Sequence, residues 1–314
     1  MKSRTTPVKN VVKIEDIPKY LKLIDDIFGT DKIISGFKDK NQIVKYYRLS
    51  HIGYTLIHSG KGAVHMALSD DGKFSKDNYA TQPSFIDTII KNGAKQRILE
   101  LGCGNGYNSI WLAKRNPKVT FTGIDLTPIH LKMSKKHSKN LDNLQFIEGD
   151  FEDTHIKENS YDTLFAVESV CHAESVEKVP SETYRLLDKD GSLIIFDAFR
   201  KVNRTLFDKD LNTMASLVER SMAVKNFSSL DYFLETLHAV GFKEIQVEDM
   251  SNCAMPNFFH LQYYSFHFFK RVSRAKLLKS LLPVELVQNS IAGLFMPVTL
   301  EMGIFGYYRI IAKK

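Results

Sequence analysis

The chain has few of the features that mark secreted, metal-binding or membrane-spanning proteins. Its 314 residues include one tryptophan and three cysteines, namely Cys103, Cys171 and Cys253. Three widely spaced cysteines argue against a disulfide framework, so we expect reduced thiols inside a cell. No Cys-x-x-Cys pair or histidine cluster is present, and we predict no metal site. No uninterrupted apolar run reaches the roughly 18 residues that a membrane-spanning helix needs.

The first residues and the charge balance exclude further classes. Residues 1–10 lack the apolar centre of a secretory signal, so we expect a cytoplasmic protein. The net charge is +7, from 43 basic and 36 acidic residues. The basic residues are dispersed, and no pattern of a nucleic-acid-binding module accompanies them. We therefore expect no nucleic-acid partner.

A glycine-spaced turn is the most informative feature that is present. Residues 98–106 read Ile-Leu-Glu-Leu-Gly-Cys-Gly-Asn-Gly, an apolar strand that runs into a turn. Residues 107–115 have helical spacing, which puts the turn at the positive N-terminal end of a helix. Glycines let a ligand approach the backbone closely. The three that alternate here are Gly102, Gly104 and Gly106.

This turn resembles motif I of the class I S-adenosylmethionine (SAM) methyltransferases, in which an acidic residue, here Glu100, precedes G-x-G-x-G. The resemblance implies SAM as the cofactor. SAM carries an ammonium and a sulfonium but no phosphate, so a carboxylate beside the loop suits it. An NAD-dependent oxidoreductase would need the third glycine one residue later. A SAM-fold protein that binds without catalysis would predict a degraded motif, and this one is intact.

The next two predicted strands also end in acidic residues. Residues 119–124 lead to Asp125, and an acidic residue there binds ribose hydroxyls in Rossmann-type and SAM folds. Leu126 follows, and Thr127 with Pro128 then opens a helix. A third strand, residues 144–148, leads to Asp150 and Phe151. The resemblance implies that Asp150 accepts from the adenine amine and that Phe151 offers its backbone or ring.

The fourth predicted strand, residues 161–167, runs into Glu168-Ser-Val-Cys-His172-Ala. Ligands of open α/β sheets bind beyond the carboxyl ends of the strands, so Glu168 and His172 should face the transferred methyl group. The run resembles the sterol C-methyltransferases and their small-molecule relatives. Alternatively, His172 caps the following helix and Cys171 packs in the core. The predicted cofactor-binding residues are Glu100, Gly102, Gly104, Gly106, Asp125, Leu126, Asp150, Phe151 and Glu168.

The N-terminal arm departs from the sterol methyltransferase pattern. That family carries a Tyr-Tyr pair and then Tyr-Glu-Tyr-Gly-Trp-Gly. This chain has Tyr46-Tyr47 and Tyr54, followed by His58 and His65, but no Gly-Trp-Gly. The departure puts a sterol substrate in doubt. Tyrosine faces could stabilise a carbocation while a base removes a proton, or these residues could simply pack in the core. The predicted catalytic residues are Glu168, His172, His65 and Tyr47.

The remaining pattern completes an α/β fold. We predict a seven-stranded, mostly parallel Rossmann-like sheet with an antiparallel last strand, and later strands at residues 192–197, 243–248 and 305–312. The expected division is an N-terminal helical arm or substrate lid (1–80), a SAM-binding core (81–250), a helical, aromatic-rich cap (251–303) and the final strand (304–314). The cap segment could close an apolar pocket or rest on a membrane surface with its lysines at the headgroups.

These features predict SAM-dependent methyl transfer to an apolar small molecule, an isoprenoid or lipid, with C-methylation of an alkene favoured. Methylation of an oxygen or nitrogen of a quinone, phenol or amine is the alternative. A cytoplasmic protein with peripheral membrane contact fits both. The sequence leaves the acceptor and the oligomeric state open.

Overall fold

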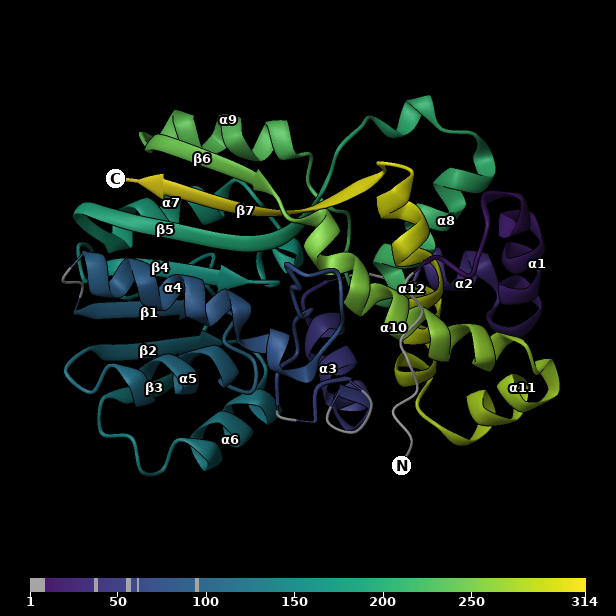
Figure 1. Ribbon diagram of the computed structural model, residues 1–314, viewed down its shortest axis with the longest axis horizontal. Coiled ribbons are helices and arrows are strands. Elements are labelled where there is room, and N and C mark those ends of the chain that lie inside the picture. Colours follow the sequence, from purple (N-terminus) through teal and green to yellow (C-terminus); the bar gives the residue numbers. More distant parts are fainter. Residues whose placement is uncertain (1–8, 37–38, 55–57, 61, 94–95) are drawn as a thin grey trace.

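The computed structural model describes residues 9–36, 39–54, 58–60, 62–93 and 96–314. In this part of the chain a seven-stranded sheet has the order β3-β2-β1-β4-β5-β7-β6 (Figure 1). Neighbouring strands from β3 to β5 pair in parallel, and β7 is antiparallel to both β5 and β6. The predicted mostly parallel sheet with an antiparallel last strand is therefore confirmed. The strands are β1 (Arg97–Leu101), β2 (Thr120–Asp125), β3 (Leu144–Glu148), β4 (Tyr161–Val167), β5 (Leu187–Arg200), β6 (Lys243–Asp249) and β7 (Phe305–Lys313).

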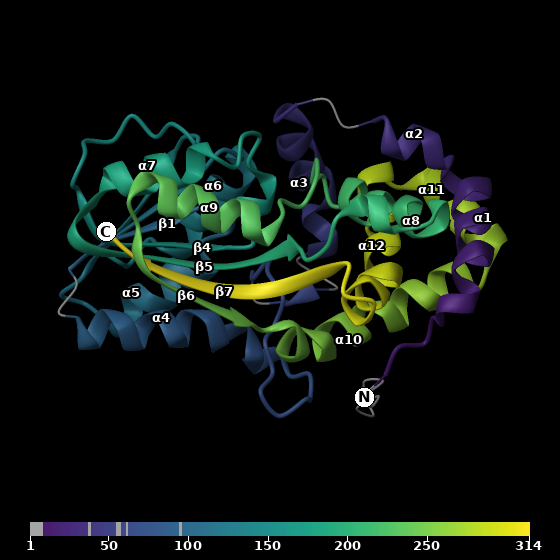
Figure 2. The same ribbon diagram turned by 90° about the horizontal axis from the view of Figure 1, so that it is seen from above.

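The central strands are apolar because helices cover both faces of the sheet. Ile98, Leu164 and Ile194 in β1, β4 and β5 have no exposed surface. Helices α4 and α5 lie on one face, and α7 and α9 lie on the other (Figure 2). These helices are α4 (Thr81–Asn92), α5 (Tyr107–Arg115), α7 (Lys178–Leu186) and α9 (Leu230–Val240).

Strand β5 is longer than the predicted residues 192–197. It pairs with β7 from Ser192, opposite Lys313, to Arg200, opposite Phe305. The extension past residue 197 therefore depends on a strand that lies more than a hundred residues later in the sequence. Local hydrophobic pattern alone does not reveal such pairing.

A layer of helices lies beyond the carboxyl edge of the sheet (Figures 1 and 2). Much of the aromatic run 258–269 is inside this layer, where Phe258, Phe259 and Phe269 are buried. Helix α12 packs against α3, α8 and α10. The helices are α1 (Ile17–Phe28), α2 (Thr30–Ile34), α3 (Asn41–Gly53), α8 (Lys209–Ser221), α10 (Ser251–Phe269), α11 (Val272–Leu281) and α12 (Val284–Glu301).

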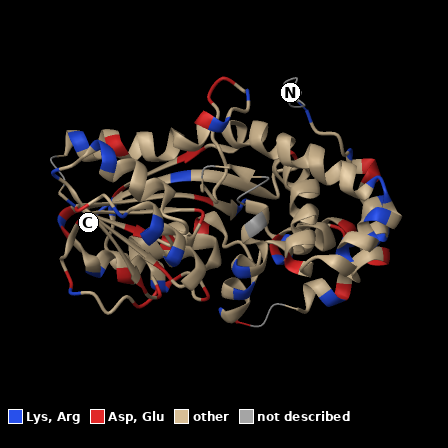
Figure 3. Cartoon of the chain, turned by 90° about the horizontal axis from the view of Figure 1, so that it is seen from below, with Lys and Arg blue, Asp and Glu red and all other residues tan. Residues whose placement is uncertain are grey.

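The remaining helices are short or join strands. Helix α6 (Pro128–His137) connects β2 to β3 and begins with proline at its first position, as predicted. The 3-10 turns are Ile14–Asp16, Lys76–Ala80, Val170–His172 and Arg204–Leu206. Basic and acidic residues are interspersed along the chain (Figure 3). Among the described helices, none combines the length and the apolar character that crossing a bilayer requires.

Candidate active site

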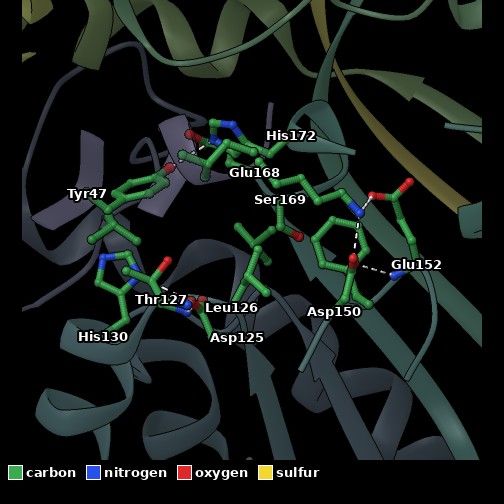
Figure 4. A pocket seen from close by; sticks show the side chains of 17 residues that line it. Tyr47, Asp125, Leu126, Thr127, His130, Asp150, Glu152, Glu168, Ser169 and His172 are labelled. Carbon is green, nitrogen blue, oxygen red and sulfur yellow. Dashed lines mark hydrogen bonds and ion pairs between the residues drawn. The ribbon is translucent and has the colours of Figure 1, made fainter. Parts of the chain in front are cut away.

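A cavity lies at the carboxyl edge of the parallel strands, and residues of α3 contribute to its lining (Figure 4). Parallel strands end at the same edge, so the loops after β1 to β4 all reach this cavity. Seven of the nine predicted cofactor-binding residues line it. They are Gly102, Gly104, Asp125, Leu126, Asp150, Phe151 and Glu168.

The first two glycines of the loop form a tight floor for the cavity. Gly102 has a φ of 64° and Gly104 a φ of 52°, a region that side-chain-bearing residues rarely adopt. A Cβ on Gly102 would lie 2.4 Å from Cβ of Ser169, and one on Gly104 would lie 2.9 Å from Cγ2 of Val64. Both positions therefore need glycine for space as well as for conformation.

Glu100 and Gly106 do not line the cavity, and their contact with the cofactor stays a prediction. Oε1 of Glu100 accepts from Nδ2 of Asn108 at 3.0 Å, and Oε2 accepts from the Ser109 amide at 3.1 Å and hydroxyl at 2.5 Å. Burial raises the pKa of Glu100 to about 7. The carboxyl group points into the junction of β1 and α5, so Glu100 supports the loop from behind.

Gly106 is required by packing, which gives a stability prediction. Its φ is 80°, and a Cβ there would lie 2.6 Å from Cζ of Phe146 and 2.9 Å from Cβ of Ser134. We expect Gly106→Ala to destabilise the fold by about 2–5 kcal/mol, the sum of left-handed strain and overpacking. Urea unfolding measures the change.

The matched control is Gly72→Ala. Gly72 has a φ of 71°, but a Cβ there would meet nothing within 4 Å. This variant should lose only the conformational part, about 1–2 kcal/mol. Equal losses for the two variants would show that packing around Gly106 is not tight.

Asp125 is held as an anion at the cavity wall. Its Oδ2 accepts from the Gly104 amide at 2.7 Å, and its Oδ1 accepts from the Thr127 amide at 2.7 Å. Nδ1 of His130 lies 3.6 Å from Oδ1. Burial alone would raise the pKa of Asp125, but His130 and the two backbone donors hold it below its usual value. The carboxylate keeps lone pairs for further donors, such as a pair of hydroxyls.

Asp150, the predicted partner of the adenine amine, is paired with the N-terminal arm. Nζ of Lys40, the residue before α3, lies 2.5 Å from Oδ2 of Asp150 and also bonds Glu152. Burial would lower the pKa of Lys40, but these two carboxylates raise it. Neither Lys40 nor Glu152 was predicted as a site residue. A lysine in a mixed loop sequence carries no local signal of such a contact.

Glu168 lies in the cavity wall in a strained conformation. Its φ is 52°, which is uncommon for a residue with a side chain and often marks functional sites. Oε1 accepts from the Met66 amide at 2.6 Å and from the Tyr307 hydroxyl at 2.8 Å. Burial raises the pKa of Glu168 to about 8. The group is therefore mostly neutral at pH 7 in the free protein.

The raised pKa of Glu168 predicts a pH-dependent stability. In the folded state Glu168 keeps its proton up to about pH 8, whereas in the unfolded chain it loses the proton near pH 4.5. Its contribution to the free energy of unfolding is therefore full below pH 4.5 and is lost as the pH rises through about 8. We expect Glu168→Gln to lose less stability than the wild type over that interval, measured by urea unfolding at several pH values. Glu148→Gln, at an exposed position on β3, should follow the wild type. If the free energy of unfolding changed with pH in the same way for all three proteins, the raised pKa of Glu168 would be contradicted.

His172 and Tyr47 form a hydrogen-bonded pair that faces the cavity (Figure 4). Nδ1 of His172 lies 3.2 Å from the Ala223 carbonyl oxygen, which can only accept, so Nδ1 carries the proton. Nε2 then accepts from the Tyr47 hydroxyl at 2.9 Å. Burial lowers the pKa of His172 to about 4, so the ring is neutral. The ring enters the cavity and does not cap the next helix.

The other predicted arm residues do not reach the cavity. Nε2 of His65 lies 3.1 Å from the Tyr79 carbonyl oxygen, and the side chain is buried away from the lining. Tyr46 bonds Asn289 at 2.5 Å and the Tyr54 hydroxyl at 2.8 Å. His65 is not among the residues that line the cavity, so its role in the reaction stays a prediction.

The predicted cap, the segment 251–303, packs behind α3. It is helical, as predicted, but none of its residues is in the cavity lining. Helix α12 packs against the outside of α3, and α3 contributes Ile43 and Tyr47 to the cavity. Helix α3 of the arm therefore forms part of the cavity wall. The lid role of the arm and the cap role of the segment 251–303 stay predictions. No group of three or more metal-ligating side chains occurs in the part of the chain that the structure describes.

Comparisons with known proteins agree with this geometry. Residues 99–195 match the methyltransferase domain family. The chain is 28% identical over 186 residues to 24-methylenesterol C-methyltransferase 3 of Arabidopsis thaliana, covering 57% of this chain and 51% of the relative. It is 23% identical over 244 residues to sterol 24-C-methyltransferase of Kluyveromyces lactis, covering 76% and 64%. The chain thus spans about half to two thirds of these curated relatives.

Solved structures extend the likeness to the arm and the helical layer. The crystal structure of the [4+2]-cyclase SpnF has a TM-score of 0.68 and 17% identity, and the match covers 88% of this chain and 97% of that one. At this identity the likeness concerns the fold alone. The core of the present chain resembles that of the class I SAM-dependent methyltransferases and is similar to the sterol C-methyltransferases. The resemblance in the glycine loop and SAM as the cofactor are thereby confirmed.

Proposed function

We propose that this protein transfers the methyl group of SAM to an apolar small molecule, an isoprenoid or lipid, with C-methylation of an alkene favoured. One observation carries the proposal. The hydrogen-bonded pair of Tyr47 and His172 lines the same cavity as the glycine loop and Asp125. Candidate groups for binding SAM and for handling a proton thus face one space.

SAM supplies an electrophilic methyl group on a positively charged sulfur. Gly102 and Gly104 leave space that a Cβ would fill. This space supports a close approach of such a cofactor to the backbone. Asp125 is an anion with free lone pairs, which suits the ribose hydroxyls. Asp150 would accept a hydrogen bond from the adenine amine, either beside its bond to Lys40 or after that bond breaks. These roles remain predictions for the residues named.

The acceptor side of the cavity suits an apolar substrate. Ile43 and Val64 contribute to its lining, and the Tyr47 ring lies 4.8 Å from the His130 ring. If an alkene attacks the methyl group, a carbocation forms, and the face of Tyr47 can stabilise it by cation–π attraction. A nearby base must then remove a proton. The neutral His172 can accept it, and Glu168 can accept it only in its ionised form. Helix α3 would act as the lid that excludes water.

The alternative acceptors use the same residues differently. A phenol or other hydroxyl substrate needs a neutral base near the attacking oxygen, and Nε2 of His172 is such a group once Tyr47 gives way. We favour the apolar acceptor because the relatives of 23–28% identity are named as sterol C-methyltransferases. The missing Gly-Trp-Gly of the arm argues against a sterol itself.

A labelled-methyl assay tests the proposal. The full chain is incubated with SAM carrying a tritiated methyl group, in parallel with a total lipid extract and a polar metabolite extract. We expect label in the lipid extract, much less label with Asp125→Ala at a SAM concentration near the wild-type Kd, and unchanged labelling with Glu148→Ala. Label only in the polar fraction would overturn the apolar acceptor. No label in either, with SAM bound, would overturn methyl transfer and favour a reaction such as cyclisation.

A further inference from the structure

Exposed large hydrophobic side chains are concentrated on the surface around α11. Eleven large hydrophobic side chains are exposed among the described residues, and five of them lie within residues 272–284. Leu277 is 57% exposed, Leu281 70% and Leu282 42%. We call these three leucines, with Val284, the α11 face. Contiguous exposed apolar side chains of this kind mark interaction surfaces more often than isolated ones do.

Helical geometry places the two most exposed leucines together. Leu277 and Leu281 are four residues apart, so they are neighbours on one side of α11. Ala275 is fully buried and marks the opposite side, which packs against the helical layer. Nζ of Lys279 donates to the Ile27 carbonyl at 2.5 Å and holds α11 against α1. The leucines therefore point outward from a helix that is anchored behind.

Basic residues border the α11 face, and acidic residues do not interrupt it. Residues 270–284 contain five Lys and Arg residues and no Asp or Glu. Besides the anchored Lys279, these are Lys270, Arg271, Arg274 and Lys276, and none of the four has an ion-pair partner in the described part of the chain. Helix α1, which packs against α11, carries two lysines and two aspartates and adds no net charge (Figure 3).

Within the segment 251–303, most of the exposed large hydrophobic side chains lie in its middle. In the aromatic run of α10, Phe258, Phe259 and Phe269 are buried, and Tyr264 is exposed. Most of α12 is also covered, because it packs against α3, α8 and α10. Only α11 and the turn after it combine exposed leucines with unpaired cations.

We propose that the α11 face docks this protein onto the surface of an anionic lipid bilayer. Leucines that enter the headgroup boundary and lysines or arginines that pair with anionic lipids are the two parts of interfacial binding. The helix would lie on the bilayer without crossing it. This inference does not depend on the reaction, but it would bring the cavity close to lipophilic molecules.

Vesicle sedimentation tests the proposal on the full chain. We expect binding to phosphatidylcholine vesicles that contain phosphatidylserine, and little binding to vesicles of phosphatidylcholine alone. Leu277→Gln with Leu281→Gln should weaken binding about ten-fold, since both leucines lose their apolar contact. Raising the salt concentration should weaken it further, because the cations are exposed.

Matched controls distinguish binding through the α11 face from nonspecific binding to vesicles. The first control is Leu206→Gln, at a position that is 75% exposed on a 3-10 turn after β5. The second control is Lys135→Gln with Lys136→Gln, at exposed positions on α6. Both controls should bind like the wild type, whereas Arg274→Gln with Lys276→Gln should bind less. Equal losses in controls, or no preference for phosphatidylserine, would overturn the proposal. A dimer abolished by the leucine changes, without vesicle binding, would overturn it by assigning the face to a second copy.

Discussion

Asp125→Ala is expected to weaken SAM binding by about 1.5–3 kcal/mol, or roughly 10- to 150-fold in Kd. Asp125 is an anion at the cavity wall, and its hydrogen bonds to two ribose hydroxyls would be charge-assisted. The same carboxylate accepts from the amides of Gly104 and Thr127, so its removal also loosens the glycine loop. Equilibrium dialysis with labelled SAM measures the change.

A neighbouring residue provides the control for Asp125. Glu148 lies opposite Asp125 in the pairing of β2 with β3, but it is exposed and does not line the cavity. Glu148→Ala should therefore bind SAM like the wild type. Urea unfolding of both variants checks that the fold survives. A folded Asp125→Ala protein with an unchanged Kd would remove this residue from the cofactor site.

Tyr47→Phe is expected to lower kcat about 100-fold while SAM affinity changes by less than about three-fold. The hydroxyl donates to Nε2 of His172, and its loss leaves the ring held only through Nδ1 at the Ala223 carbonyl. General acid–base groups contribute roughly 10²–10⁴ to rate, so a misplaced base has an effect of this order. The measurement is the rate of methyl transfer at saturating SAM, once the acceptor is in hand.

Two further variants separate the hydroxyl of Tyr47 from its ring. Tyr54→Phe removes a hydroxyl that bonds Tyr46 and does not line the cavity, so it should keep the wild-type rate. Tyr47→Leu should be slower than Tyr47→Phe if the ring stabilises a carbocation. Wild-type rates for both Tyr47 variants would exclude this residue from the reaction.

The part of the fold that local pattern governs could be predicted from the sequence. The β1 strand, the glycine loop and α5 occur within twenty residues. Their hydrophobic spacing and their glycines together indicate a strand, a turn and a helix in that order. The same holds for Asp125 and for Thr127 with Pro128 at the start of α6. Such short-range units place a side chain at a known edge of the sheet, which is why seven of nine predicted cofactor residues line the cavity.

Contacts between distant segments could not be predicted. Lys40 meets Asp150 from 110 residues away, and Glu168 joins Met66 near the start of the chain to Tyr307 near its end. The choice between Tyr47 and His65 likewise depends on packing. Helix α12 holds α3 through Asn289 and Tyr46, which sets the side of α3 that faces the cavity. No pattern within the arm encodes that contact.

The burial of ionisable groups is a second property that the sequence does not reveal. Glu100 and Glu168 both follow apolar stretches, but Glu100 turns into the protein and Glu168 lines the cavity. Glu168 has a left-handed backbone just after β4, whereas Glu100 lies within β1. Such a conformation depends on the surrounding loops.

Calorimetric titration of the purified, folded protein tests the central idea, that this cavity receives a sulfonium-bearing nucleoside. We predict saturable heat with one equivalent of SAM and with one equivalent of its demethylated product, and none with NAD. Absence of heat with both sulfur compounds, or heat with NAD alone, would contradict the account.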